Sequence, residues 1–104
     1  MINTLSENQW REYNSQGYSH LGKVLMDEEL TTLQWQMDEI MMGCAPLDYN
    51  RMLMQLDQPG TGKLGPQTKG HKGATLSYRK IQDLELDPHF LAYMQKPLFR
   101  HICA

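Results

Sequence analysis

The clearest periodic pattern lies in residues 27–43, where apolar side chains recur every three or four positions. These side chains are Leu30, Leu33, Met37, Ile40 and Met41. Such spacing places them along one face of an α-helix and leaves polar residues on the other. Asp27 is a favourable N-cap, and Gly43 is a typical C-terminal stop. The sequence therefore predicts an amphipathic helix over residues 27–43.

A second main helix is predicted near the N-terminus. Ser6 and Gln9 have the spacing of a capping box, and Gly17 supplies a stop about three turns later. Residues 18–25 follow with a short apolar stretch that predicts a strand. The first helix is thus expected to begin close to residue 5 and to end at Gly17.

Two shorter helical patterns lie near the C-terminus. Asp87 is a suitable N-cap and Pro88 a suitable first helical residue, and a small apolar side follows, made of Phe90, Leu91 and Met94. Pro97 interrupts this pattern. A further apolar set then has helical spacing: Leu98, Phe99 and Ile102. We expect two short helices here.

Residues 49–56 and 75–86 alternate apolar and polar side chains, which is typical of strands with one buried face. Between them, residues 57–73 are rich in Gly, Pro and Lys, and the sequence predicts a mobile Gly-rich loop. We expect the two strands to pair as a long antiparallel hairpin. The predicted fold class is α+β, with two main helices and short helices packed on a small antiparallel sheet.

One charged side chain lies in the middle of the second predicted strand. Lys80 and Gln82 fall in the same row as four apolar residues: Leu76, Tyr78, Leu84 and Leu86. Burying an ammonium group among apolar side chains costs free energy unless an anion meets it. Lys80 therefore either extends its charged end into water from a shallow row or reaches a bound anion.

Several short motifs resemble the phytanoyl-CoA dioxygenase family. The principal one precedes Phe90 and Pro97 and reads Tyr78-Arg79-Lys80-Ile81-Gln82-Asp83-Leu84. The front of the chain is also similar, in the pairs Gly17-Tyr18 and Val24-Leu25 and in the acidic helix start Asp27-Glu28-Glu29-Leu30. The motifs are short, but together they extend over most of the chain.

The resemblance implies a fold, a chemistry and one site. Members of the family are oxygenases that depend on Fe(II) and 2-oxoglutarate, built on a double-stranded β-helix barrel. Their Lys in the K-[IV]-Q-[DN] strand helps to hold 2-oxoglutarate, and it matches Lys80. Gln82, two residues further on, is a weaker candidate for the same pocket. The full relative would hydroxylate a small organic substrate while 2-oxoglutarate is decarboxylated to succinate.

The chain departs from the family in its iron ligands. A facial triad needs two His and one carboxylate around an open metal site, and the family provides the first two as His-x-Asp. None of the four histidines is followed two positions later by Asp or Glu: His20, His71, His89 and His101. The sequence is therefore expected to be the N-terminal portion of such an oxygenase, with no catalytic or metal-binding residue. Alone it is expected to bind no iron and to be inactive, and its natural partner would be the missing C-terminal barrel.

The alternative is a non-catalytic interaction module. A surface that evolved to receive a barrel would be exposed in this chain, and exposed apolar patches bind partners. This predicts a homodimer through the face of Leu76, Tyr78, Leu84 and Leu86, or through the strand that contains Met52 and Met54. The methionine-rich set fills a core or lines a substrate channel, and it comprises Met37, Met41, Met42, Met52 and Met54.

Length and composition restrict these alternatives further. The 104 residues, 1–104, fit a single domain of modest core. The formal net charge of -2 argues against a nucleic-acid-binding surface, which needs a basic stripe. Cys44 and Cys103 have no metal-site or redox spacing and indicate a reducing compartment. Neither a leader nor an apolar run of membrane-spanning length is present, so we expect a cytoplasmic protein without membrane contact.

Overall fold

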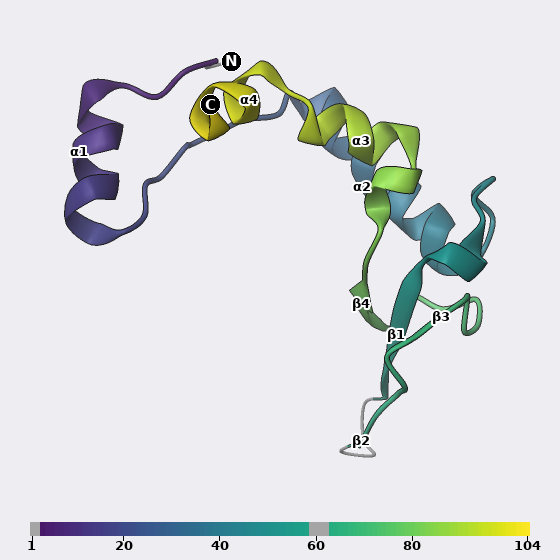
Figure 1. Cartoon of the computed structure of the whole chain (residues 1–104). Coiled ribbons are helices and arrows are strands. Elements are labelled where there is room, and N and C mark those ends of the chain that lie inside the picture. The colour runs from purple at the N-terminus through teal and green to yellow at the C-terminus, as the bar shows by residue number, and fades with distance from the viewer. Residues whose placement is uncertain (1–2, 59–62) are drawn as a thin grey trace.

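The computed structural model of the chain describes residues 3–58 and 63–104. Within these residues the elements follow one another as shown in Figure 1. They are α1 (Glu7–Gln16), α2 (Asp27–Met42), η1 (Tyr49–Arg51), β1 (Leu53–Gln58), β2 (Lys63–Leu64), β3 (Thr68–Lys69), β4 (Tyr78–Ile81), η2 (Leu84–Leu86), α3 (Pro88–Met94) and α4 (Pro97–Cys103). The predicted α+β class, with helices beside a small antiparallel sheet, is confirmed.

Both predicted main helices are present. At the start of α1, the Ser6 side-chain oxygen accepts a hydrogen bond from the Gln9 N–H at 3.1 Å, and Gln9 Oε1 accepts one from the Ser6 N–H at 2.8 Å. These reciprocal bonds satisfy backbone N–H groups that a helix start leaves free. α2 begins at Asp27, so its N-cap is Met26 rather than the predicted Asp27. Both helices end at a glycine in the left-handed conformation, as expected.

The sheet is built on β1, because each of the other described strands pairs with it in the antiparallel direction. β4 pairs along its centre, with Met54 opposite Ile81 and Gln55 opposite Lys80. β3 pairs with the beginning of β1 and β2 with its end. The predicted pairing between the two main strand segments is therefore confirmed.

The second main strand is shorter than its sequence pattern indicated. β4 covers Tyr78–Ile81, whereas Leu84–Leu86 form the short helix η2. The cause lies at Asp83, whose φ of 67° takes the backbone out of the extended region. Leu84 and Leu86 reach the core from that short helix rather than from a strand face. The predicted row of apolar side chains along residues 75–86 is therefore wrong.

Two further boundaries differ from the sequence prediction. Residues 49–51 form η1, because the Asp48 side chain accepts a hydrogen bond from the Asn50 N–H at 3.2 Å and starts a helical turn there. The predicted strand over residues 18–25 is absent, and Gly22 within it has a φ of 74°. Such a backbone conformation does not continue a strand, so this segment connects α1 to α2 without pairing.

The segment 57–73 contains regular structure that its composition did not predict. The end of β1 and the strands β2 and β3 lie in it, while residues 59–62 fall outside the described residues. Between β2 and β3 the Gly65 N–H donates a hydrogen bond to the Leu56 carbonyl at 3.2 Å, so this returning segment stays close to β1. The mobility predicted for residues 57–73 stays a prediction.

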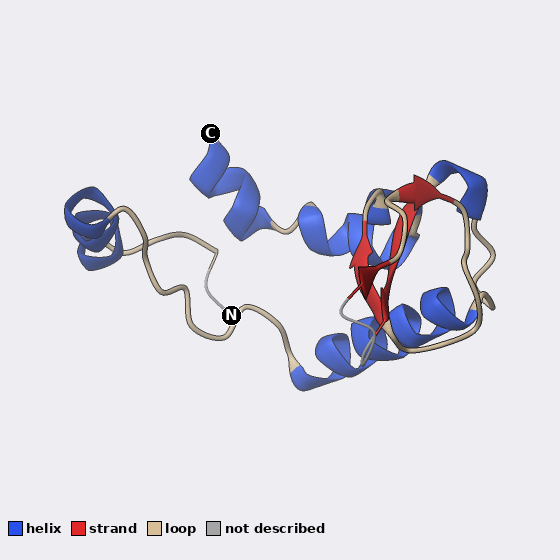
Figure 2. Cartoon of the chain, turned by 90° about the horizontal axis from the view of Figure 1, so that it is seen from below, coloured by secondary structure: helices blue, strands red, loops and turns tan. Residues whose placement is uncertain are grey.

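The core lies where α2 meets the sheet (Figure 2). Ile40 of α2, Met54 of β1 and Met52 just before it are fully buried, and Ala45 is nearly so. Half-buried side chains close the core on its sides: Leu47, Tyr49, Tyr78, Ile81, Leu84, Leu86 and Phe90. Met52 and Met54 thus belong to the core, where their unbranched side chains fill an irregular space. Their burial also removes the Met52/Met54 strand as an exposed dimer face.

An aromatic cluster fastens the segment after β3 to the end of α2. The His71 ring lies between Tyr49 and Tyr78, with ring centroids 5.2 Å and 5.8 Å away. His71 Nε2 is 2.8 Å from the Met41 carbonyl oxygen. A Cβ atom at Gly43 would be 2.8 Å from the His71 ring, so the glycine gives this ring its space. Burial raises the pKa of the Tyr49 hydroxyl above its ordinary value of 10.0.

The chain is extended for its length. Its radius of gyration is 16.8 Å, whereas a compact domain of this size has about 13 Å. Figure 1 shows α1 at one end of an arch, well away from the sheet. Large apolar side chains remain exposed on this arch, among them Trp35 at 61% and Leu76 at 60%. Of the helices in the described residues, none combines the length and apolarity that crossing a membrane requires.

The position of Met54 at the contact between β1 and α2 yields a test of the core. Replacing Met54 with Ala leaves a cavity, so we expect the free energy of unfolding to fall by about 2–5 kcal/mol. The matched control is Met94→Ala, because Met94 is 45% exposed. The Met94→Ala change is expected to alter the free energy of unfolding by about 0.5 kcal/mol or less, apart from the small difference in helix propensity between Met and Ala. Urea unfolding followed by circular dichroism measures both, and equal losses would contradict this core.

Candidate functional site

The candidate site begins with Lys80, the residue that the family resemblance assigns to the cosubstrate. Lys80 lies in β4 opposite Gln55, and the next pair along the strands is Met54 with Ile81. Because neighbouring residues of a strand point to opposite faces, Lys80 lies on the face opposite to Met54 and Ile81. The Lys80 side chain therefore leaves β4 on the face away from the buried core, although it still lines the edge of the sheet beside α2.

A register shift next to Lys80 explains why the sequence pattern misplaced it. Gln55 pairs with Lys80 but the following Leu56 pairs with Tyr78, so Arg79 is an extra residue in β4. Such a bulge reverses the alternation of side chains. Tyr78 consequently packs on the core while Lys80 faces the other side. The prediction that Tyr78 and Lys80 share one face is wrong.

The contacts of Lys80 on its own face are polar and come from the sheet. Lys80 Nζ donates a hydrogen bond to Gln67 Oε1 at 3.4 Å. The cross-strand neighbour Gln55 is only 3% exposed, and its Nε2 donates to the Gly65 carbonyl at 2.8 Å. Within residues 3–58 and 63–104, no carboxylate forms an ion pair with Lys80. An ammonium group has three donors, so Lys80 retains capacity to bind an anion.

A groove of about 330 Å³ runs between α2 and the free edge of β4. Lys80 and Arg79 contribute to its lining together with apolar residues: Met37, Met41, Leu76, Tyr78, Ile81 and Leu84. An apolar groove with a few positioned polar groups is typical of small-molecule sites. The two cationic residues favour an anionic group on such a molecule.

Gln82, the weaker candidate, is not held in the sheet. β4 ends at Ile81, and the Gln82 N–H donates a hydrogen bond to the Leu53 carbonyl at 2.9 Å. Its side chain is exposed and has no hydrogen bond to Lys80. The structure thus fixes one of the two predicted cosubstrate residues in a strand and leaves the side chain of the other in solvent.

The potential iron ligands do not come together in the described part of the chain. No group of three His, Cys, Asp or Glu residues that could hold a metal is present there. His89 Nδ1 lies 3.2 Å from Asp87 Oδ1, but the buried Asp87 carboxylate also accepts hydrogen bonds from the Gln36 side chain and the Phe90 N–H. Asp87 is therefore engaged as the N-cap of α3. These residues do not fit a facial triad by themselves.

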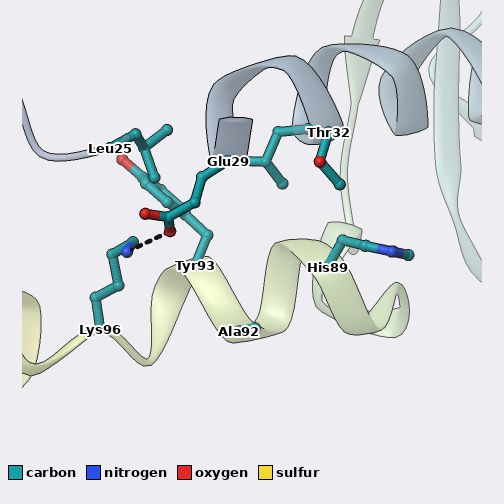
Figure 3. A pocket seen from close by; sticks show the side chains of 8 residues that line it. Leu25, Glu29, Thr32, His89, Ala92, Tyr93 and Lys96 are labelled. Atoms are coloured by element: carbon teal, nitrogen blue, oxygen red, sulfur yellow. Dashed lines mark hydrogen bonds and ion pairs between the residues drawn. The ribbon is translucent and has the colours of Figure 1, made fainter. Parts of the chain in front are cut away.

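A second, smaller pocket lies between α2 and α3 (Figure 3). It measures about 170 Å³ and is lined by Leu25, Glu29, Thr32, Leu33, His89, Ala92, Tyr93 and Lys96. At one end, Lys96 Nζ donates a hydrogen bond to Glu29 Oε2 at 2.6 Å, and His89 lies at the other end. This ion pair ties the first turn of α2 to the junction between α3 and α4.

The Glu29 carboxylate is stabilised in its charged form. The hydrogen bond from Lys96 lowers the pKa of Glu29 below its ordinary value of 4.5, and a hydrogen bond from the Met26 N–H contributes further. Sequence analysis missed the Glu29–Lys96 pair. The helix dipole already explains an acidic residue such as Glu29 in the first turn of α2, and no local sequence pattern indicates a partner 67 residues away.

Comparison of the chain with protein-family models, with curated proteins and with solved structures found no match. Lys80, its groove and the sequence motifs around it are therefore the features from which a function can be inferred.

The lowered pKa of Glu29 predicts a defined pH dependence. A carboxyl group with a lower pKa in the folded than in the unfolded chain adds stability above its unfolded pKa and loses it as the pH falls through the folded value. Wild-type stability is thus expected to decline more steeply with acid than that of Glu29→Gln, from about pH 4.5 downward. Lys96→Met removes the hydrogen bond to Glu29, so the stability of this variant should likewise fall less steeply with acid. Parallel profiles in urea unfolding between neutral and acidic pH would contradict the pairing.

Proposed function

We propose that this chain is the N-terminal part of an Fe(II)- and 2-oxoglutarate-dependent oxygenase similar to the phytanoyl-CoA dioxygenase family, and that Lys80 binds a carboxylate of 2-oxoglutarate. The observation that carries the proposal is the half-buried residue Lys80, whose ammonium group has a neutral amide, Gln67, as its hydrogen-bond partner in the described residues. The proposed family rests on the resemblance of the motif Tyr78-Arg79-Lys80-Ile81-Gln82-Asp83-Leu84.

The geometry at Lys80 supports binding of an anion. A bond of 3.4 Å to an amide oxygen is long, because good N–H···O bonds measure about 2.7–3.2 Å. A carboxylate would instead form a shorter, charge-assisted hydrogen bond. Exchange of the Gln67 amide for a carboxylate of 2-oxoglutarate is therefore favourable for Lys80. Gln82 would contribute only if its side chain turned back toward the sheet.

The layer arrangement supports a missing partner on the Lys80 face. Domains are built from packed layers, and an antiparallel sheet commonly packs one face on the core and leaves the other face open to water or to a further layer. α2 covers the Met54 face, whereas the Lys80 face meets side chains of the sheet itself, Gln55 and Gln67. The barrel of a complete relative would pack there and enclose Lys80.

The iron and its ligands belong to that barrel in this proposal, because the described residues do not fit a triad. In the complete relative, the metal and 2-oxoglutarate supply the oxidising chemistry for hydroxylation of a small organic substrate. This chain's part is to position one carboxylate of the cosubstrate and to support the barrel. A cytoplasmic location is part of the same proposal, and the free thiols of Cys44 and Cys103 support it.

The second candidate function is a non-catalytic module that forms a homodimer. The observation in its favour is exposed apolar surface, with Leu76 at 60%. Tyr78, Leu84 and Leu86 are half-buried against the core, so Leu76 would be the centre of such a face. A dimer of this kind would be driven by apolar burial and would persist in high salt.

Titration of the isotope-labelled chain with 2-oxoglutarate, followed by NMR, tests the assignment of Lys80. We expect chemical-shift changes centred on β4 and the neighbouring part of β1. Lys80→Met should reduce the affinity by about tenfold or more, the loss typical of one charge-assisted hydrogen bond. Gln82→Ala is the matched control two residues away and is expected to change the affinity much less.

Two results would contradict the proposal. One is an absence of shift changes in β4 at saturating 2-oxoglutarate, and the other is equal binding by wild type and Lys80→Met. Succinate formation by the purified chain with Fe(II) and 2-oxoglutarate would disprove only the expectation that the chain is inactive alone.

A further inference from the structure

Charge is distributed unevenly along the chain. Residues 51–80, hereafter the basic hairpin, contain six Lys or Arg and one Asp, a net charge of +5. The remaining residues contain four Lys or Arg and eleven Asp or Glu, a net charge of -7. Figure 1 shows the hairpin end that carries β2 extending away from the helices. A nearly neutral chain thus presents two parts of opposite charge, a separation that suggests electrostatic binding.

A groove of about 410 Å³, hereafter the Trp35 groove, is lined only by residues outside the basic hairpin, in the part of the chain with the net charge of -7. It runs between the second half of α2 and the segments 44–47 and 86–89, with Pro46, Leu47 and Pro88 among its apolar walls. Trp35 and Glu39 of α2 also line it. The groove is separate from the Lys80 site, to which it contributes no residue.

The groove has the chemistry of a site for a cationic side chain. Trp35 is 61% exposed, and Asp38 and Glu39 follow it by three and four residues, so all three lie on neighbouring parts of the helix surface. In the described residues the Glu39 carboxylate has no ion pair or hydrogen bond. An indole face beside carboxylates attracts a guanidinium group through cation–π and charge-assisted contacts. Exposed Trp residues also dominate the energetics of many interfaces.

Several side chains of the basic hairpin have this chemistry and form no ion pair with a carboxylate of the described residues. Lys72 donates to two backbone carbonyls, and Lys80 donates to an amide. Arg51, Lys69 and Arg79 are exposed, and within residues 3–58 and 63–104 their side chains form no ion pair. Within one copy these cations therefore form no ion pair with the carboxylates of the groove.

We propose that the Trp35 groove binds the basic hairpin of a second copy of this chain, with the guanidinium group of Arg51 or Arg79 against Trp35 and close to Glu39. Charge complementarity selects this occupant, because the groove belongs to the part with a net charge of -7 and the hairpin to the part with +5. Arginine suits the site better than lysine, since its planar group stacks on an indole.

The two surfaces are different, so the contact is head-to-tail. Each copy offers one groove and one hairpin, and such an interface forms rings or short chains rather than a two-fold dimer. This distinguishes it from the homodimer through Leu76, which would use the same patch on both copies. The inference does not rest on the proposed oxygenase function, because the contact needs no 2-oxoglutarate, although Arg79 also lines the groove beside Lys80.

Complementary variants test the interface by sedimentation velocity. The groove variant carries Trp35→Ala and Glu39→Lys, and the hairpin variant carries Arg51→Glu, Lys69→Glu and Arg79→Glu. We expect the wild type to form oligomers at low salt, each variant to be monomeric alone, and an equimolar mixture to form a 1:1 complex. Raising the salt from about 0.05 M to about 0.5 M should weaken wild-type association by about tenfold or more.

The control variant is Arg11→Glu with Arg100→Glu, which reverses charges outside both surfaces and should still associate. Circular dichroism tests whether each variant is folded. If a multiple variant does not fold, the single change Trp35→Ala or Arg79→Glu is used in its place. A wild type that stays monomeric at low salt would overturn the proposal. Association that is insensitive to salt, or a mixture of folded variants that remains monomeric, would do so as well.

Discussion

The structure depends on burial of β1 against α2. Ile40, Met52 and Met54 are the fully buried apolar side chains of this contact, and β1 is the strand with which each other described strand pairs. Without that contact the sheet would lose its buried face, and small sheets of short strands are not stable without packing against a helix or another layer. The small core also explains why much apolar surface stays exposed, since a chain of this size buries only about two thirds of its unfolded surface.

The same contact determines where polar chemistry can occur. One face of β1 is committed to the core, so polar side chains gather on the other, where Gln55, Gln67 and Lys80 meet across three neighbouring segments. The bulge at Arg79 makes this separation possible in β4, because it allows Tyr78 to pack inward while Lys80 points outward. A single extra residue in β4 thus sets the position of the proposed anion-binding group.

Local sequence signals predicted the helices well and the sheet only in part. Ser6, Gly17 and Gly43 mark helix ends through backbone requirements that act within a few residues, and these were confirmed. Alternation alone could not reveal the bulge at Arg79 or the positive φ of Asp83, because both arise from pairing with β1 and from packing after it. The composition of residues 57–73 likewise conceals two strands. The sequence pattern drew attention to Lys80, but the face on which Lys80 lies, its Gln67 partner and the Glu29–Lys96 pair depend on contacts between distant segments.

The fit between Gly43 and His71 has a consequence for related sequences. The imidazole occupies the volume that any side chain at position 43 would need, and that ring also bridges two tyrosines and the last turn of α2. The two positions are thus sterically coupled although 28 residues separate them. A side chain at position 43 requires a smaller group than His71 and must also adopt the left-handed backbone that Gly43 has, with a φ of 79°. Homologous chains that share this architecture and lack Gly at position 43 should therefore carry a smaller residue at position 71.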